Sequence, residues 1–503
     1  MKNNSVNIPD STSFKDVKLS NDLSENLINI RTIMDNSSDL LINQLIVSGH
    51  KCSLVSLEGM VSTSMCTELI FRPLANINLA QGSTPEDVFT QLQSFNIMSL
   101  DRAMSYTFGE LIHFLMSGFV IILVNGVNSA ICLGIQGYEK RSVSEPTTEA
   151  NLQGSQDGFV EVVRTNMSLI RRRLKTPLLK FELFPLGAKS QTDICLVYMT
   201  DKAPAKLVKQ IKGNLSKVDL EIILAGGYIE PFLESNTLSI FSGVSTTQRP
   251  DVLCAKINEG RVAVLVDGTP FAIIVPTLFI ENFQTLDDYS NRPFYGTYIR
   301  WLKYFAVFLA MVLPGLYVAI ATFHPEMFTH SLLLNLSAAQ ELTPFNLTIE
   351  AVIVILLYEI IREAGIRMPK VVGSAVGIVG GLVIGDAAVS SGLISTPLLI
   401  ILGLTATSSF VIPNLNQQVS VLRFLFIFAG GYLGLYGVAL LTALVLFNIC
   451  SMETFGIPYT APLAPFTLKA MKDVLIRMSF KTLEKDATII ENLKGVTSYK
   501  DSK

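Results

Sequence analysis

Residues 302–449 carry far less charge than the rest of the chain, and this contrast limits the possible folds more than any other feature. The stretch holds eleven charged residues: Lys303, Glu326, Glu341, Glu350, Glu359, Arg362, Glu363, Arg367, Lys370, Asp386 and Arg423. Long apolar segments with so few charges are typical of helices that cross a bilayer, each of which needs about 20 residues. We therefore expect an α+β/α-helical membrane protein, with a soluble half followed by a polytopic helical transmembrane domain.

The soluble half contains a repeated pattern. Four short runs rich in valine, isoleucine and leucine predict buried strands: CSLVSLEG (52–59), VIILVNG (120–126), ICLVYMTD (194–201) and VAVLVDG (262–268). A shift of 142 residues superposes three pairs of segments: Leu54-Val55 on Leu196-Val197, Leu123 to Gly126 on Leu265 to Gly268, and Ala130-Ile131 on Ala272-Ile273. Three matches in one register indicate two tandem-duplicated α/β lobes, each with a hairpin turn of Asn-Gly or Asp-Gly.

These patterns divide the chain into seven expected parts. They are a flexible N-terminal segment (1–37), a first α/β lobe (38–137), a linker with an amphipathic helix (138–179), a second α/β lobe (180–277), a connector (278–300), the transmembrane domain (301–449) and a C-terminal tail (450–503). The polar N-terminus, MKNNSVNIPDSTSFKD, lacks the apolar core of a signal peptide. We therefore expect the N-terminal domain to be cytoplasmic.

The apolar half divides into five segments: 301–323, 347–361, 371–389, 395–412 and 421–449. Basic residues flank the start of the first segment, which predicts that this end lies inside. Five full crossings would leave the tail outside, yet its seven lysines and one arginine favour the inside. We therefore expect four to five membrane segments, with either 347–361 or 421–449 re-entrant or broken. The sequence does not choose between these two.

The third segment, VVGSAVGIVGGLVIGDAAVSSG (371–392), carries a stripe of glycines four residues apart. They are Gly373, Gly377, Gly381 and Gly385. Small residues in register let membrane helices approach closely, so the stripe predicts helix packing. The same helix has a valine face: Val376, Val379 and Val383. In a monomer this face would meet lipid, whereas in a ring of subunits it would line a pore and close it by dewetting.

Four membrane acids have two open interpretations. They are Glu350, Glu359, Glu363 and Asp386. Asp386 is either hydrated at the interface or part of a cation-attracting ring. Glu359 and Glu363 lie four residues apart, so they either pair with Arg362 or Arg367 or belong to an ion path.

The linker sequence predicts contacts between domains. The stretch EPTTE (145–149) is extended or turn-like, and residues 159–174 form an amphipathic helix that ends in three arginines. The arginines either complement the last helical turn or contact an acidic surface or anionic lipid. The candidate coupling residues are Glu145, Glu149, Arg171, Arg172 and Arg173.

Several classes of function find no support in the sequence. The net charge of −3 gives no basic field for nucleic acid. There is no Walker loop, no GxSxG or HExxH motif, and the four histidines are scattered, so we expect no enzyme activity, cofactor or metal. The six cysteines include no CxxC pair, which argues against a disulfide framework or zinc site.

Seven stretches together resemble one known family. They are EPTTE (145–149), TNMSLIRRR (165–173), RPD (249–251), GRVAVLVDGTPF (260–271), REAGIRMP (362–369), the glycine segment (372–389) and FGIPYTAPLAP (455–465). Across residues 115–480 the chain is similar to the A subunit of the GerA-type nutrient germinant receptors (GerABKA family) of endospore-forming bacteria.

The resemblance implies a function in spore germination. It implies a subunit of a receptor in the spore inner membrane, with a transporter-like B subunit and a lipoprotein C subunit as partners. It also implies a homo-oligomer, a pentameric ring, that forms a nutrient-gated cation channel. Two other hypotheses stay open: a secondary transporter subunit and a non-conducting assembly scaffold.

Overall fold

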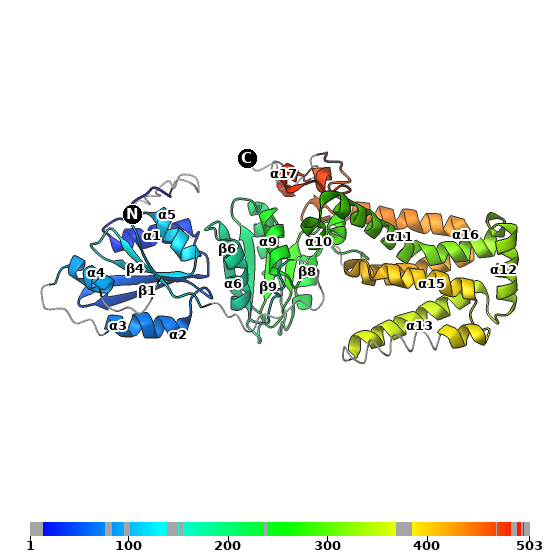
Figure 1. Ribbon diagram of the computed structural model, residues 1–503, viewed down its shortest axis with the longest axis horizontal. Helices are drawn as coiled ribbons and strands as arrows, with labels where there is room; N and C mark the ends of the chain where they lie inside the picture. The colour runs from blue at the N-terminus through cyan, green and yellow to red at the C-terminus, as the bar shows by residue number, and fades with distance from the viewer. Residues whose placement is uncertain are drawn as a thin grey trace.

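Two β-sheet lobes and a bundle of helices follow one another along the long axis of the molecule (Figure 1). We refer to the first lobe (14–137), the second lobe (154–277), the helical region (293–451) and the tail (453–496). The computed structural model describes these residues: 14–75, 83–94, 101–137, 149, 154–235, 239–368, 385–468, 470–483, 490–493 and 496.

The first lobe contains a five-stranded antiparallel sheet. Its strands, in spatial order, are β1 (Leu40–Val47), β2 (His50–Leu57), β4 (Phe119–Val124), β5 (Ala130–Gly134) and β3 (Arg102–Ser105). Helices α1 (Leu23–Ile33) and α5 (Phe108–Met116) cover one face. The other face is covered by α2 (Thr63–Cys66), η1 (Thr67–Phe71), α3 (Arg72–Ala75) and α4 (Pro85–Ser94). Every side chain of β4 is buried, as a central strand between two helical layers requires.

The second lobe repeats this arrangement. Its strand order is β6 (Leu179–Leu186), β7 (Thr192–Met199), β9 (Val262–Val266), β10 (Ala272–Val275) and β8 (Ser245–Thr247). Helices α6 (Val163–Arg173) and α9 (Pro250–Asn258) cover one face. The other face is covered by α7 (Ala205–Leu215), η2 (Gly226–Tyr228), α8 (Glu230–Leu233) and apolar residues of the tail.

The shift of 142 residues preserves both strand and face. Leu54 and Leu196 lie in β2 and β7 and point into the layer that holds α4 or α7. Their neighbours Val55 and Val197 point to the opposite face, into the layer of α1 or α6. Adjacent strand residues alternate between faces, so this agreement shows that the two sheets share one register.

The helix expected in the linker is part of the second lobe. In α6, Val163 and Ile170 are buried against the second sheet, in the position that α1 occupies on the first sheet. The expected linker of 138–179 is therefore too long at its C-terminal end. The amphipathic pattern of 159–174 reflected packing against a sheet rather than an independent helix.

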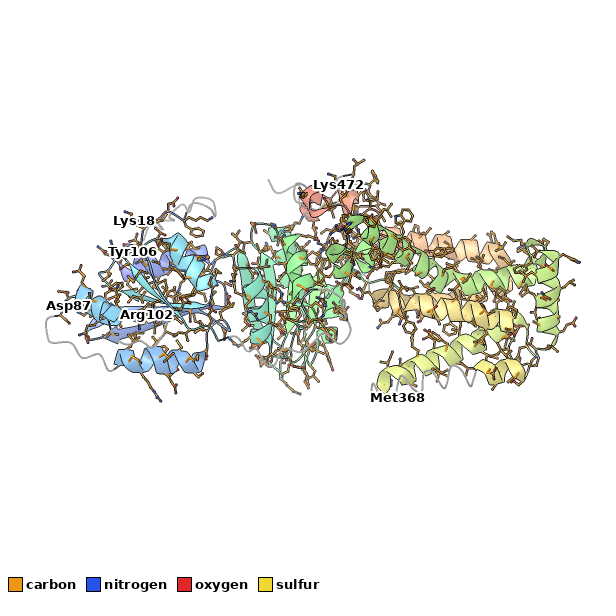
Figure 2. The ribbon with its side chains drawn as sticks, in the orientation of Figure 1. Lys18, Asp87, Arg102, Tyr106, Met368 and Lys472 are labelled. Carbon is orange, nitrogen blue, oxygen red and sulfur yellow. The ribbon has the colours of Figure 1, made fainter. Side chains whose placement is uncertain are left out.

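The helical region begins after η3 (Phe279–Phe283) and α10 (Leu286–Ser290). Helix α11 (Pro293–Phe323) runs away from the lobes, and α12 (His330–Glu341) lies at the far end after η4 (Pro325–Met327) (Figure 1). Helix α13 (Leu347–Arg367) runs back, and its last turn is next to Met368, labelled in Figure 2 on the side of the lobes. A short helical segment (385–390) and α15 (Thr396–Ser409) follow.

Helix α16 (Asn416–Ser451), which follows η5 (Pro413–Leu415), is a helical hairpin rather than one straight rod. Gly434 breaks it with φ 62° and ψ −149°, a conformation open almost only to glycine. Beyond the break, Asn448 accepts a hydrogen bond from Ser239 of the second lobe at 3.1 Å. The start of α16 also faces the lobes, because Asn414 lines a cavity with Thr247. Of the two segments that the sequence left open, 421–449 is the broken one.

Glycines let α11 and α16 pack closely. A side chain at Gly315 would collide with the backbone of Phe426, and one at Gly430 would collide with the carbonyl oxygen of Gly315. Small residues at such crossings permit backbone contact between helices.

The tail returns to the second lobe. It contains β11 (Glu453–Thr454), β12 (Ile457–Pro458), η6 (Ala470–Asp473), α17 (Phe480–Leu483) and η8 (Ile490–Asn492). Ile457, Val474 and Leu493 join the hydrophobic core under β7 and β9. The tail is thus packed onto the lobe, and α17 lies near α10 in Figure 1.

Candidate functional site

A buried ion pair joins the two lobes. The guanidinium of Arg171, the first of the three predicted arginines, contacts the carboxylate of Asp39 at 2.8 Å, and both side chains are almost fully buried. Arg171 also donates to the carbonyl oxygens of Thr176 and Leu179 and lies over the ring of Phe181. This pair places the end of α6 against the start of β1, so it is a rigid contact between lobes.

Hydrogen bonds extend this contact along the edge of the second sheet. The amide of Ser38 donates to the carbonyl oxygen of Phe181 at 2.9 Å, and the amide of Phe181 donates to Ser37 Oγ at 3.1 Å. Lys180 pairs with Asp35 at 2.6 Å. Edge strand β6 is thereby covered by the first lobe, which leaves fewer free backbone groups on that edge.

The other two arginines have different surroundings. Arg173 pairs with Asp157 at 2.9 Å and donates to Ser155 Oγ, so it holds the segment that precedes α6. Arg172 is half-buried. Arg171 and Arg173 therefore have separate partners, and of these two it is Arg171 whose ion pair joins the two lobes.

Glu149 attaches the end of the EPTTE stretch to the second lobe. Its carboxylate accepts hydrogen bonds from the hydroxyl of Thr247 at 2.8 Å and from the amide of Gln248 at 3.1 Å. Arg249 donates to the backbone carbonyl of Glu149 at 3.2 Å. Burial raises the pKa of the Glu149 carboxyl above its usual value, although these hydrogen bonds and Arg249 oppose the shift. Glu145 lies outside the described residues.

Glu149 also borders a polar cavity where the second lobe meets the helical region. The cavity has a volume of about 200 Å³, and its wall includes Thr247 and Arg249 of the lobe, Lys303 of α11 and Pro413 before α16. One cavity thus touches the linker, the second sheet, α11 and the segment before α16. A shift of any of them would change its shape.

Charged groups fix the lobe-proximal end of α11. Lys303 pairs with Asp288 of α10 at 2.9 Å, and Arg300 pairs with Asp473 of the tail at 3.0 Å. Nearby, burial alone would raise the pKa of Glu281, but Arg261 and Lys256 hold that pKa below its usual value. Charge pairs therefore hold the connector, the tail and α11 together.

A charge cluster lies inside the helical region. Glu359 of α13 pairs with Arg362 at 2.5 Å and approaches Arg423 of α16 at 3.5 Å. Arg423 is buried and donates to the backbone carbonyl of Ala310 on α11 at 2.9 Å. The cluster connects three helices, and two guanidinium groups face one carboxylate.

The other membrane acids have separate positions. Glu363 pairs with Arg367 at 2.6 Å on the exposed end of α13. Glu350 is buried at the other end of α13 and accepts from the amide and hydroxyl of Ser395. Asp386 is exposed. The pairs expected for Glu359 and Glu363 are therefore present.

The predicted pore face and most of the glycine stripe lie outside the described residues. These positions are Gly373, Val376, Gly377, Val379, Gly381 and Val383. Gly385 begins the described segment 385–390, where an added side chain would meet Leu399 at 3.8 Å, an ordinary contact. Within the described residues, no group of three His, Cys, Asp or Glu side chains is placed to hold a metal ion.

Comparison with known proteins decides the family. Residues 28–489 match the family described as Bacillus/Clostridium GerA spore germination protein. The chain belongs to the GerA family. A GerA relative, spore germination protein KA of Bacillus subtilis (strain 168), is 36% identical over 493 residues, which cover 97% of this chain and 90% of the relative. Spore germination protein GerLA of Bacillus cereus is 34% identical over 474 residues, covering 93% and 96%.

A solved structure from the GerA family also matches. It is the crystal structure of the N-terminal domain of the A subunit of the Bacillus megaterium spore germinant receptor GerK3. The match has a TM-score of 0.40 and 30% identity, and it covers 52% of this chain and 97% of that domain.

The sequence alone did not predict some of the residues that form the ion pairs of this GerA protein. Asp39 lies in a polar stretch, NSSDLL, with no sign of its distant partner. Arg423 did carry a signal, since it is the only charge in the segment 421–449. A lone arginine among apolar membrane residues marks a buried partner, here Glu359 and a backbone carbonyl.

Proposed function

We propose that this chain is the A subunit of a nutrient germinant receptor in the spore inner membrane, and that several copies assemble into a nutrient-gated cation channel. The family match over residues 28–489 is the observation that carries the receptor assignment. The glycine and valine pattern of 371–389 supports the channel.

Placement of the helical region in a membrane has structural support. Among the described residues, two helices, Pro293–Phe323 and Pro413–Ser451, are long and apolar enough to cross a bilayer. Large apolar side chains on their surfaces are exposed, such as Phe305, Tyr432 and Phe447. Contiguous exposed apolar surface indicates contact with lipid or with other protein.

Contacts support the proposed topology. The tail packs on the second lobe, so both lie on the same side of the membrane. The hairpin of α16 contributes two limbs rather than one crossing. The proposed topology has an even number of passages and both chain ends inside, in agreement with the basic tail.

The proposed signal passes through the lobes. In this proposal a partner subunit binds the nutrient, and the change reaches the lobes through the pair of Arg171 and Asp39. The cavity beside Glu149 and Lys303 then transmits it to α11 and α16. Shifts of the glycine helices open the valine constriction. The partners are a B subunit, a C subunit and further copies of this chain in a pentamer.

Valine substitutions test the pore. Val379→Ala or Val383→Ala shortens the apolar constriction, so we expect cation leak and germination without nutrient. Ile378→Ala is the matched control, because helical spacing puts position 378 away from the face of 376, 379 and 383, and it should behave as the parent. If the valine variants conduct and respond as the parent does, the pore assignment is wrong.

The break at Gly434 supports a second candidate, a secondary transporter subunit, because broken helices form substrate sites in transporters. Substrate-coupled flux without channel currents would favour this candidate. A scaffold would instead show normal complex stoichiometry, with ion leak unchanged in every helix variant.

A further inference from the structure

An apolar groove runs between α13 and α15. Its volume is about 560 Å³, and most of its wall is apolar, with Ile355, Leu357, Leu402 and Ala406 among the lining residues. Gly403 opens the wall, because among the described residues no atom lies within 4 Å of a side-chain carbon added there. Helix α15 has 14 residues, so the groove follows a helix about 21 Å long.

Two arginines line the groove in its half nearer the lobes. Arg362 and Arg423 line it, whereas Glu359, which pairs with both, does not. Arg362 lies close before Met368, which marks the lobe-proximal end of α13 (Figure 2). The face that the groove presents at this end is therefore positive.

Each of the two arginines has an N–H donor without a hydrogen-bond partner among the described residues. Arg423 is buried, and its Nη2 has no hydrogen-bond partner among the described residues; neither has Nε of Arg362. A buried guanidinium donor without an acceptor is costly, since it loses water and gains no bond. An anionic group in the groove would accept these hydrogen bonds.

We propose that the groove binds an anionic phospholipid, with its phosphate between Arg362 and Arg423 and one acyl chain along α13 and α15. The inference rests on the membrane placement in the proposed function. Guanidinium groups bind phosphate through paired, charge-assisted hydrogen bonds. Basic pockets between membrane helices on the cytoplasmic side suit anionic headgroups.

The dimensions favour a lipid over a free anion. One leaflet contributes about half of the roughly 30 Å hydrocarbon core, so a helix of about 21 Å is long enough to accompany an acyl chain. A small anion such as inorganic phosphate would leave the apolar wall unfilled. A second copy of this chain could fill the groove only if it placed an acidic group beside the same two arginines.

Lipid retention by the purified full-length protein tests this site. The protein in detergent is mixed with phosphatidylglycerol or with phosphatidylcholine of the same acyl chains, and retained lipid is measured by mass spectrometry. We expect selective retention of phosphatidylglycerol. Arg362→Gln should reduce it at least about tenfold, because a charge-assisted hydrogen bond is lost.

Arg367→Gln is the matched control. It removes the same charge from the same helix end, but Arg367 is exposed, pairs with Glu363 and lies outside the groove wall. Gly403→Leu is a second test that fills the groove and leaves every charge in place. It should also reduce retention, while the melting temperature shows that the variant is folded.

Any of three results of the retention assay would overturn the proposal: equal retention of the two lipids, equal loss in Arg362→Gln and Arg367→Gln, or displacement of phosphatidylglycerol by inorganic phosphate alone. The last would assign a phosphate site instead. If an acidic segment of a second copy occupies the groove instead, the protein should form oligomers that retain no lipid and that are lost in Arg362→Gln. That result would also overturn the lipid proposal. The assay measures lipid retention and not conduction, so its result tests the lipid site separately from the proposed channel.

Discussion

Arg171 and Asp39 show how a single pair of residues holds two lobes together. Both charges are buried, and Arg171 uses its remaining donors on backbone carbonyls. Removing one partner of such a pair leaves the other charge without compensation and costs about 3–5 kcal/mol. The pair therefore makes the relative position of the lobes sensitive to either residue.

Glu149 gives the linker a dependence on pH. Its pKa is raised in the folded chain, mainly by burial, so the folded state binds a proton more tightly than the unfolded state. The contribution of Glu149 to the free energy of unfolding therefore increases as pH falls from above the raised pKa toward the usual pKa of a glutamate. We predict that the parent gains melting temperature relative to Glu149→Gln between pH 7.5 and pH 5.

The comparison of parent and variant removes the effect of all other titrating groups. Melting temperatures of both purified proteins are measured at each pH. If the difference in melting temperature between the two proteins is the same at every pH, Glu149 has no proton-linked role in stability.

At the scale of elements, the hairpin of α16 depends on Gly434. A non-glycine residue at φ 62° and ψ −149° is strained, by about 1–3 kcal/mol. Gly434→Ala should therefore lower the stability of the purified protein by about this amount, measured as a shift in the denaturation midpoint. Gly403→Ala is the control, because its methyl meets no atom of the described residues within 4 Å and the site is helical. An unchanged midpoint for Gly434→Ala would mean that the limbs do not need this turn.

Elements with one dominant signal could be predicted from the sequence. Strands β2, β4, β7 and β9 lie between two helical layers, so they read as continuous apolar runs. Strands β1 and β6 flank them, and most of their residues are half-buried or exposed, so their sequences LLINQLIV and LKFELFPL contain no such run. The fold of the lobes was predictable mainly through the repeat, and β1 and β6 were not.

The candidate site was predictable only where partners lie close in sequence. The pairs of Glu359 with Arg362 and of Glu363 with Arg367 follow from helical spacing. Asp39 meets Arg171 across the two lobes, and Arg423 meets Glu359 across two helices. Such contacts depend on how whole elements pack, which local spacing does not encode.

At the scale of the whole molecule, the contacts predict a specific topology. Gly434 lies beside Phe323, the last residue of α11, and α12 follows at the end of the helical region away from the lobes (Figure 1). The tail packs on the second lobe. A membrane-impermeant maleimide should label the thiol introduced by Tyr436→Cys from the face opposite the lobes. It should label the native Cys450, which is exposed, only from the lobe face.

The labelling uses vesicles of both orientations. Tyr436→Cys is placed in a chain that carries Cys450→Ser and Cys66→Ser, because the other four cysteines are buried. Labelling of positions 436 and 450 from the same face would contradict the two-limb crossing of α16.

Conduction by the reconstituted protein tests the central claim most directly. The purified chain is placed in a planar bilayer, with and without its expected B and C partners, and cation current is recorded before and after nutrient is added. The account predicts current that requires this chain, rises with nutrient when the partners are present, and becomes constitutive in Val383→Ala. A complete assembly that responds to nutrient but passes no current through this chain would contradict it.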